Sequence, residues 1–372
     1  MSGVTRARVG EGDHERDCVH ERDLDRVHER DRIHDRIHDR VHDRVHERDR
    51  VHARVRHRVR ALALLLAATL AASFVGGCAS PRDEGPARLR VMAFNLWHGG
   101  DAGGVGVDGL AAVVRAGAAD LVGVQEGLGW ASAPGEPRPV RSAELAEALG
   151  FHHLALDGGR AILSRHPIAA ASRAGHGALI ETPWGEVALY CVHFAHAPYQ
   201  PYQLVGIEYH GGAFLETADE AIAAARAARG TQIIALLDDV VRSRWDVPTF
   251  VVGDFNEPSH LDWTAAAVEA GLVPLAVEWP STRALTTAGF VDGYRALAPD
   301  ASTAPGHTWT PLTAPDDPSD RHDRIDLVLA RRATPIAAQV VGESAAYADL
   351  VVTPYPSDHR AVVVEWELER ER

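Results

Sequence analysis

Polar side chains stand at the ends of several apolar segments of this sequence. One apolar segment, Phe250–Gly253, runs directly into Asp254-Phe255-Asn256. In a β-strand, residues two positions apart point to the same face of the sheet, so Asp254 and Asn256 are expected to project together. Taken alone, the pair favours an ordinary Asx turn, because Asp and Asn are common turn residues. The rest of the chain decides between the two interpretations.

The same pattern recurs along the chain. The other polar residues at or near the ends of predicted strands are Asn95, Glu126, His193, Asp326 and the pair Asp358-His359. So many such ends are hard to explain as turns, and strand ends converge where strands run side by side. Carboxylate and amide oxygens suit Mg²⁺, which keeps several waters and pairs with substrate phosphate. Histidines beside carboxylates suit proton transfer to and from a water. The pattern therefore predicts metal-assisted hydrolysis.

Alternating strands and helices must position these residues. Strands are expected at 88–97, 121–127, 160–168, 186–196, 249–256, 323–330 and the end of 351–368. Helices are expected at 109–120, from Ser142 as N-cap to Gly150, and at 217–245, with Ile233, Ile234, Leu237 and Val241 on one face of the last helix. Because residues 88–370 contain no Pro/Gly-rich linker, they are expected to form one α/β domain.

The chain resembles the endonuclease/exonuclease/phosphatase superfamily, which has the deoxyribonuclease I-like fold. The matching stretches, in order, are "AFNLW", "LVGVQE", "AILSRHPI", "VHF", "GDFNEP", "RIDLVL" and "SDHRAV". Each is weak alone, but "GDFN" followed at this separation by a terminal "SDH" is a specific combination. The resemblance implies an α/β (α+β) fold, a four-layer α/β/β/α sandwich in which two packed mixed β-sheets are flanked by helices.

The resemblance also implies a metal site. Glu126 would bind Mg²⁺, with Asn95 and Asp358 beside it, and Mn²⁺ is the alternative ion. The substrate would be a phosphoester: a nucleic acid, a phospholipid such as sphingomyelin, an inositol phosphate or another small phosphate ester. The reaction would be hydrolysis by an activated water.

The catalytic roles are carried over in the same way. Asp254 and Asn256 would position or activate the attacking water and hold the phosphate. His359, oriented by Asp326, would act as base or as a phosphate-binding cation. His193 would stabilise the pentavalent transition state or protonate the leaving oxygen. In-line phosphoryl transfer requires charge neutralisation, a positioned water and a donor to the leaving oxygen. The resemblance fixes this set of residues more firmly than it fixes which of them is the base.

Several further residues keep two interpretations each. His196 is either catalytic or a loop histidine, and Arg160 and Arg165 either contact phosphate or lie on the surface. The residues that either shape the rim of the site or simply pack are Trp97, Trp309, His307 and residues 197–203.

The N-terminal part of the chain has a separate character. Residues 1–60 are charged and contain a low-complexity repeat of roughly Asp/Glu-Arg-Val/Ile-His, expected to be disordered or to reflect a start codon assigned too far upstream. Residues 61–78 combine an apolar run with "VGGC", which resembles a bacterial lipobox with Cys78 as the lipidated residue. Residues 79–87 would be a tether. We therefore expect an extracytoplasmic, lipid-anchored bacterial monomer, with plain secretion as the alternative.

Charge argues against some other functions. Of the 38 basic and 52 acidic residues, 16 and 14 fall within residues 1–78, so the remainder carries a net charge of −16. An acidic body argues against broad electrostatic binding of nucleic acid, although an extracellular nuclease remains an alternative. The segment "GVGVDG" (104–109) fits a dinucleotide-binding pattern, but it does not follow a strand directly. A non-catalytic surface lipoprotein on the same scaffold is the remaining alternative.

Overall fold

The computed structural model describes residues 87–369. The predictions for residues 1–60, for the segment 61–78 with Cys78, and for all but the last residue of the tether lie outside these residues. Within the described part of the chain, no helix combines the length and the apolar character needed to cross a membrane.

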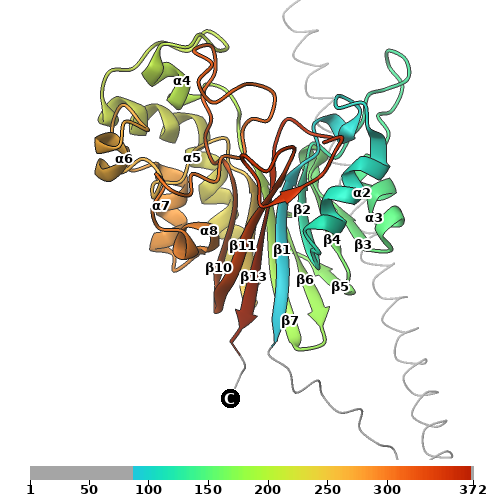
Figure 1. Ribbon diagram of the computed structural model, residues 1–372. Helices are drawn as coiled ribbons and strands as arrows, with labels where there is room; N and C mark the ends of the chain where they lie inside the picture. Colours follow the sequence, from blue (N-terminus) through green and yellow to red (C-terminus); the bar gives the residue numbers. More distant parts are fainter. Residues whose placement is uncertain (1–86, 370–372) are drawn as a thin grey trace, which may run out of the picture. The chain divides into compact units, whose positions relative to one another are not determined.

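Two packed β-sheets form the centre of the domain (Figure 1). The seven-stranded sheet has the order β12-β11-β13-β1-β2-β4-β3. Its strands are β1 (Arg88–Asn95), β2 (Leu121–Gln125), β3 (His152–Ala155), β4 (Ala161–Ser164), β11 (Ala333–Gly342), β12 (Leu350–Val351) and β13 (Ala361–Leu368). The six-stranded sheet has the order β5-β6-β7-β8-β10-β9. Its strands are β5 (Ile168–Ala171), β6 (Gly177–Thr182), β7 (Gly185–His193), β8 (Thr249–Asp254), β9 (Val291–Asp292) and β10 (Asp326–Arg331).

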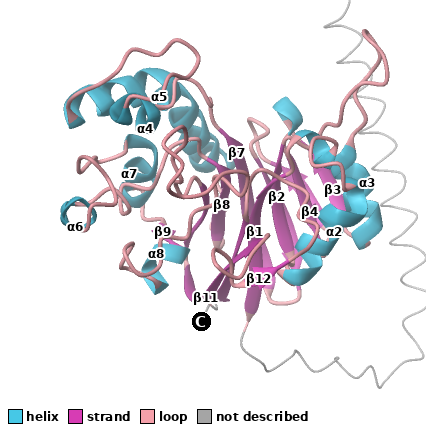
Figure 2. Ribbon diagram, turned by 45° about the horizontal axis from the view of Figure 1, so that its top comes forward, coloured by secondary structure: helices cyan, strands magenta, loops and turns pink. Residues whose placement is uncertain are grey.

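Helices cover the outer faces of both sheets (Figure 2). On the side of the seven-stranded sheet lie α2 (Gly106–Ala116) and α3 (Arg141–Leu149), and on the other side lie α4 (Gln200–Val205), α5 (Ala218–Ser243) and α7 (Pro280–Thr287). The shorter helices are η1 (His98–Gly100), η2 (Asp157–Gly159), α6 (Ala265–Glu269) and α8 (Gly293–Leu297). The predicted four-layer α/β/β/α sandwich is therefore confirmed.

The alternation of residues along β1 accounts for the layers. Leu89 and Val91 point into the core between the sheets, where they join Phe250 and Trp366. Met92 points to the other face, into the core shared with α2 and α3. Successive side chains of a strand point to opposite faces, and an apolar residue on both faces marks a strand buried on both sides. β1 is thus a central strand, and its position fixes where its last residue lies.

The register of the strands brings their polar ends to one edge. β1 runs parallel to β2, and Asn95 pairs with Gln125. β7 runs parallel to β8, and His193 pairs with Asp254. β10 runs antiparallel to β8, so its first residue, Asp326, also pairs with Asp254. Chemistry-bearing residues that are far apart in the sequence therefore meet at the same end of the two sheets.

Two helix predictions were wrong in detail. α3 begins at Arg141 after Val140, so Ser142 is not its N-cap, and the Ser142 hydroxyl instead lies 3.1 Å from Nε2 of His153. Helix α5 does begin after a capping box at Thr217. Its buried face, however, carries Ile233, Leu236 and Val240, whereas Ile234 and Val241 are exposed.

Candidate active site

The carboxylate of Asp254 lies at the centre of the polar cluster. Its Oδ1 accepts a hydrogen bond from the backbone N–H of Asn256 (2.8 Å), and its Oδ2 accepts one from Nδ2 of Asn95 (3.1 Å). Nε2 of His193 and Nε2 of His359 lie 3.5 and 3.8 Å from the same Oδ2. Burial raises the pKa of Asp254 above its ordinary value, although the charge of His359 acts against this. A buried carboxylate with two imidazoles beside it is equipped to accept a proton.

His359 and Asp326 form a second, tighter pair. Nδ1 of His359 lies 2.8 Å from Oδ2 of Asp326, and both side chains are buried. Burial alone would lower the pKa of His359, but the charges of Asp326 and Asp254 raise it to about 10. The hydroxyl oxygen of Thr308 accepts a hydrogen bond from the backbone N–H of Asp326 (3.0 Å), and the Trp309 ring packs 4.9 Å from the imidazole. The pair therefore holds a positive imidazolium in a fixed orientation.

This pair is better suited to proton and charge chemistry than to holding a metal. Ligand atoms of Asp254, Asp326 and His359 lie within 4.8 Å of one another, which is close enough for one ion. A histidine must be neutral to bind a metal, so the raised pKa of His359 means that a metal at this cluster would have to displace a proton.

Glu126 and Asp358 form the part of the site that fits a divalent cation. Burial raises the pKa of Asp358 to about 6, and the nearby charge of Glu126 raises it as well. Oδ1 of Asp358 is buried and has no hydrogen-bond partner within the described residues. Burial would also raise the pKa of Glu126, but the charges of His193 and His98 and the backbone N–H of His98 bring it below its ordinary value. Two neighbouring carboxylates, one with a buried oxygen that lacks a partner among the described residues, offer oxygen ligands of the kind that Mg²⁺ prefers.

Asn95 lies behind these carboxylates. Its Nδ2 donates to Oε1 of Glu126 (3.4 Å) as well as to Asp254, and its Oδ1 accepts from the backbone N–H of Trp97 (3.0 Å). Asn95 thus contacts both carboxylates and helps to orient them, and its place beside the ion with Asp358 stays a prediction. Its own backbone carbonyl accepts from the hydroxyl of Ser357 (2.7 Å), which ties β1 to the loop before β13.

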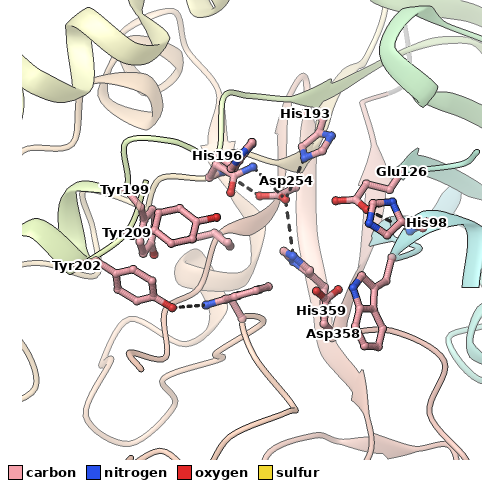
Figure 3. A pocket seen from close by; sticks show the side chains of 14 residues that line it. His98, Glu126, His193, His196, Tyr199, Tyr202, Tyr209, Asp254, Asp358 and His359 are labelled. Atoms are coloured by element: carbon pink, nitrogen blue, oxygen red, sulfur yellow. Dashed lines mark hydrogen bonds and ion pairs between the residues drawn. The ribbon is translucent and has the colours of Figure 1, made fainter. Parts of the chain in front are cut away.

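These groups surround one pocket of about 270 Å³ (Figure 3). The pocket is lined by Trp97, His98, Glu126, His193, His196, Tyr199, Tyr202, Tyr209, Asp254, Asn256, Trp309, Ile325, Asp358 and His359. Six of the predicted site residues are in this lining, while Asn95 and Asp326 are fully buried behind it. In Figure 3, Glu126 and His98 lie on one side, the three tyrosines lie on the opposite side, and Asp254, His193 and His359 lie between them.

The residues that kept two interpretations in the sequence analysis fall into two groups, those that line the pocket and those that contact other parts of the protein. Trp97, Trp309 and His196 line the pocket. Arg165 instead pairs with Asp120 at 3.0 Å, and Arg160 donates to the backbone carbonyl of Cys191 at 2.7 Å. His307 packs against His322 rather than in the pocket, with ring centroids 6.0 Å apart. The glycine-rich segment 104–109 leads into α2 and contributes no residue to the pocket lining, which removes the support for a dinucleotide site there.

Sequence reasoning missed His98 and Tyr209. His98 donates its backbone N–H to Oε2 of Glu126 (3.0 Å), and its ring nitrogen Nδ1 lies 3.4 Å from the same oxygen. Trp97 and His98 both have left-handed backbone angles, which the residue patterns of strands and helices do not predict. The available signal was an imidazole three residues after Asn95. Tyr209 comes from the long connection between β7 and α5, which has no periodic pattern.

Comparison with known proteins identifies the family. The family model described as "Endonuclease/Exonuclease/phosphatase family" matches residues 92–359. An uncharacterized protein of Caenorhabditis elegans is 26% identical over 310 residues, which cover 75% of this chain and 91% of that protein.

Solved structures are also similar to this chain. An endonuclease/exonuclease/phosphatase from Beutenbergia cavernae is 22% identical, with 76% of this chain and 72% of that chain covered and a TM-score of 0.48. A 3′ phosphatase from Neisseria, bound to a product DNA hairpin, is 14% identical, with 74% and 98% covered and a TM-score of 0.46. The family assignment rests on the match over residues 92–359: the chain belongs to the Endonuclease/Exonuclease/phosphatase family, whose members are hydrolases that act on phosphate esters.

Proposed function

We propose that this protein hydrolyses a phosphate ester with a water molecule and uses Mg²⁺, or alternatively Mn²⁺, as its cofactor. The observation that carries the proposal is a juxtaposition within one pocket. The Asp326–His359 pair and Asp254 lie beside the Glu126–Asp358 carboxylates, and the pocket of about 270 Å³ opens between them. The first group suits proton transfer and the second suits a divalent cation.

Glu126 and Asp358 would hold the ion, and Asn95 would orient Glu126. A bound Mg²⁺ would neutralise negative charge on the phosphoryl oxygens. Oδ1 of Asp358, which is buried and has no hydrogen-bond partner in residues 87–369, supports this assignment, because such a group destabilises the fold unless something binds it.

Asp254 would accept the proton of the attacking water. Burial raises its pKa, which makes it a stronger base than an exposed aspartate, and Asn95 and Asn256 fix the orientation of its oxygens. As the water oxygen bonds to phosphorus, the bond from phosphorus to the leaving oxygen breaks. His193, whose Nε2 lies 3.5 Å from Asp254 and which lines the pocket, would give a proton to that leaving oxygen.

His359 would act as a cation rather than as the base. The charges of Asp326 and Asp254 raise its pKa to about 10, which favours the imidazolium over the neutral base at neutral pH. From its place in the pocket lining it would donate a hydrogen bond from Nε2 to a phosphoryl oxygen, while Asp326 holds Nδ1. Of the two roles considered for His359, base and phosphate-binding cation, the carboxylates of Asp326 and Asp254 favour the cation.

The cellular setting is a separate proposal. We infer from the sequence that Cys78 is lipidated and that a monomeric, bacterial enzyme works outside the cytoplasm, attached to a membrane. Secretion without an anchor is the alternative. The acidic body favours a phosphoester other than bulk duplex DNA, and an extracellular nuclease remains the second candidate.

A panel of substrates tests the proposed activity. The purified protein is assayed with Mg²⁺ against plasmid DNA, single-stranded DNA, RNA, sphingomyelin, phosphoinositides and small phosphate mono- and diesters. We expect hydrolysis of at least one class, abolished by chelator and strongly reduced by His359→Ala. Folded protein that hydrolyses none of them with either Mg²⁺ or Mn²⁺ would favour the non-catalytic lipoprotein instead.

A further inference from the structure

One side of the pocket is built from aromatic rings. We call Tyr199, Tyr202, Tyr209 and Trp309 the aromatic wall; all four line the pocket. The three tyrosines come from the connection between β7 and α5, and they lie opposite Glu126 and His98 in Figure 3. Their rings pack edge to face, with centroids 4.9 Å apart for Tyr199 and Tyr202 and 5.5 Å apart for Tyr202 and Tyr209.

The polar atoms of Tyr199, Tyr202 and Trp309 are all hydrogen-bonded within the protein. The hydroxyl of Tyr199 donates to Oδ2 of Asp323 (2.9 Å). The hydroxyl of Tyr202 donates to Asp320 and accepts from Nε1 of Trp309 (3.2 Å). Neither aspartate lines the pocket. Because these hydroxyl and indole groups already have partners, Tyr199, Tyr202 and Trp309 present mainly ring carbon to whatever enters the pocket.

Buried hydrogen bonds hold the wall in place. Arg229 of α5 is fully buried, and its guanidinium donates to the side chain of Gln200 and to the carbonyl of Pro198. Asp323 accepts from Nε1 of Trp263 (3.1 Å) as well as from Tyr199. A wall fixed by its own contacts is formed before a ligand binds, which is characteristic of small-molecule sites.

The pocket thus has a charged side, formed by carboxylates, and an apolar side, formed by the aromatic wall. Asp254, His193 and His359 lie between the carboxylates and the aromatic wall (Figure 3). A phosphate held at this centre would have its metal on one side, and the group esterified to it would extend along the rings. Polar rings such as inositol would lose hydrogen bonds to water against ring carbon, whereas a flat unsaturated ring would stack there.

We propose that the aromatic wall binds a planar unsaturated ring in the group esterified to the scissile phosphate, so that the substrate is a small aryl or nucleoside phosphoester. This inference rests on the proposed function. The pocket volume of about 270 Å³ lies just below the usual range for small-molecule sites, which fits one such ring and its phosphate. Stacking of bases on aromatic side chains tolerates many ring types, so the shared feature is planarity.

Binding of matched phosphonates tests the inference without requiring turnover. Benzylphosphonate and cyclohexylmethylphosphonate have the same connectivity and charge, but only the first has a planar ring. Titration calorimetry of the full-length protein with Mg²⁺ should give a Kd for the benzyl compound that is roughly 5- to 100-fold lower. Adenosine 5′-phosphate compared with ribose 5′-phosphate applies the same test to a nucleobase. Preference for the ring in either pair supports the proposal and shows which ring type is bound better.

Substitutions of Tyr209 test whether the aromatic wall causes the preference for planar compounds. It is half-buried, and burial together with Asp254, Asp358 and Glu126 raises the pKa of its hydroxyl, which stays protonated. Tyr209→Phe keeps the ring and should keep the preference, whereas Tyr209→Leu should weaken binding of the planar compounds while changing the non-planar ones less than about twofold.

Equal binding within both pairs by the wild-type protein overturns the inference. So does an equal loss for planar and non-planar compounds in Tyr209→Leu, or a loss of preference in Tyr209→Phe, which would assign the effect to the hydroxyl. The proposed function fails separately, when the substrate panel shows no metal-dependent hydrolysis at all.

Discussion

Nδ1 of His359 lies 2.8 Å from Oδ2 of Asp326, and the two residues are 33 positions apart in the chain. The contact exists because Asp326 is the first residue of β10 in one sheet, while His359 comes just before β13 of the other sheet. This hydrogen bond therefore links a residue of one sheet to the loop that leads into the other sheet. It also explains why the imidazole is protonated although it is buried.

Replacing Asp326 by asparagine should slow the reaction. Asp326→Asn removes the negative charge that holds His359 protonated and oriented, so kcat should fall roughly 10²- to 10⁴-fold, with a much smaller change in KM. Steady-state kinetics on the substrate found by the panel measures both. Asp238→Asn, an exposed change on α5, is the control and should leave kcat unchanged. An unaltered kcat in Asp326→Asn would show that the pair takes no part in the chemistry.

Asp239 should stabilise the fold in a pH-dependent way. Burial alone would raise its pKa, but hydrogen bonds from the hydroxyl of Ser172 and the backbone N–H groups of Ala174 and His176 hold it below the ordinary value of 3.8. Because the pKa is lower in the folded state, this stability is present above about pH 3.8 and is lost as pH falls through the folded pKa. Asp239→Asn should lower the free energy of unfolding at pH 7 by about 1–3 kcal/mol.

Urea denaturation at pH 7 and at several values below pH 4 measures this effect. The difference between wild type and Asp239→Asn should shrink as pH falls. The neighbouring Asp238→Asn, which is about half exposed, should change stability by less than about 0.5 kcal/mol. A difference that stays constant down to the lowest pH would show that the charge of Asp239 contributes nothing.

Cys78 should decide where the protein is found in a bacterial cell. Lipidation of Cys78 would place the wild-type protein in the membrane fraction, and Cys78→Ser should remove it from that fraction. Fractionation, together with the mass of the N-terminal peptide, measures the outcome. Cys18→Ser is the matched control. An identical distribution of wild type and Cys78→Ser would contradict the lipid-anchor proposal.

Strand ends were the most informative part of the sequence. Residues such as Asp254 and Asn95 follow apolar runs with little ambiguity, and the period-2 geometry of strands fixes which face they share. The resemblance supplied the sandwich of two packed sheets, which the structure confirms. What no local pattern contains is the register across strands, such as the pairing of Asp326 with Asp254. That register decides which ends meet.

Helix α5 shows why other details could not be predicted. Apolar residues occur at 233, 234, 236, 237, 240 and 241, so two overlapping stripes satisfy helical periodicity. The six-stranded sheet selects the stripe with Ile233, Leu236 and Val240, because these residues pack against β7 and β8. Similarly, His98 reaches Glu126 through left-handed backbone angles, and such angles cannot be inferred from residue types of this kind.

The most direct test of the central claim is the rate of phosphoester hydrolysis as Mg²⁺ is titrated into metal-free protein. Wild type should be inactive with chelator and should recover activity with Mg²⁺. Glu126→Gln should require more Mg²⁺ or lose at least roughly 10- to 100-fold in rate. Glu144→Gln, a change at a partly exposed residue of α3, should behave as wild type. Full activity in chelator, or a wild-type Mg²⁺ response from Glu126→Gln, would contradict a metal-assisted reaction at this site.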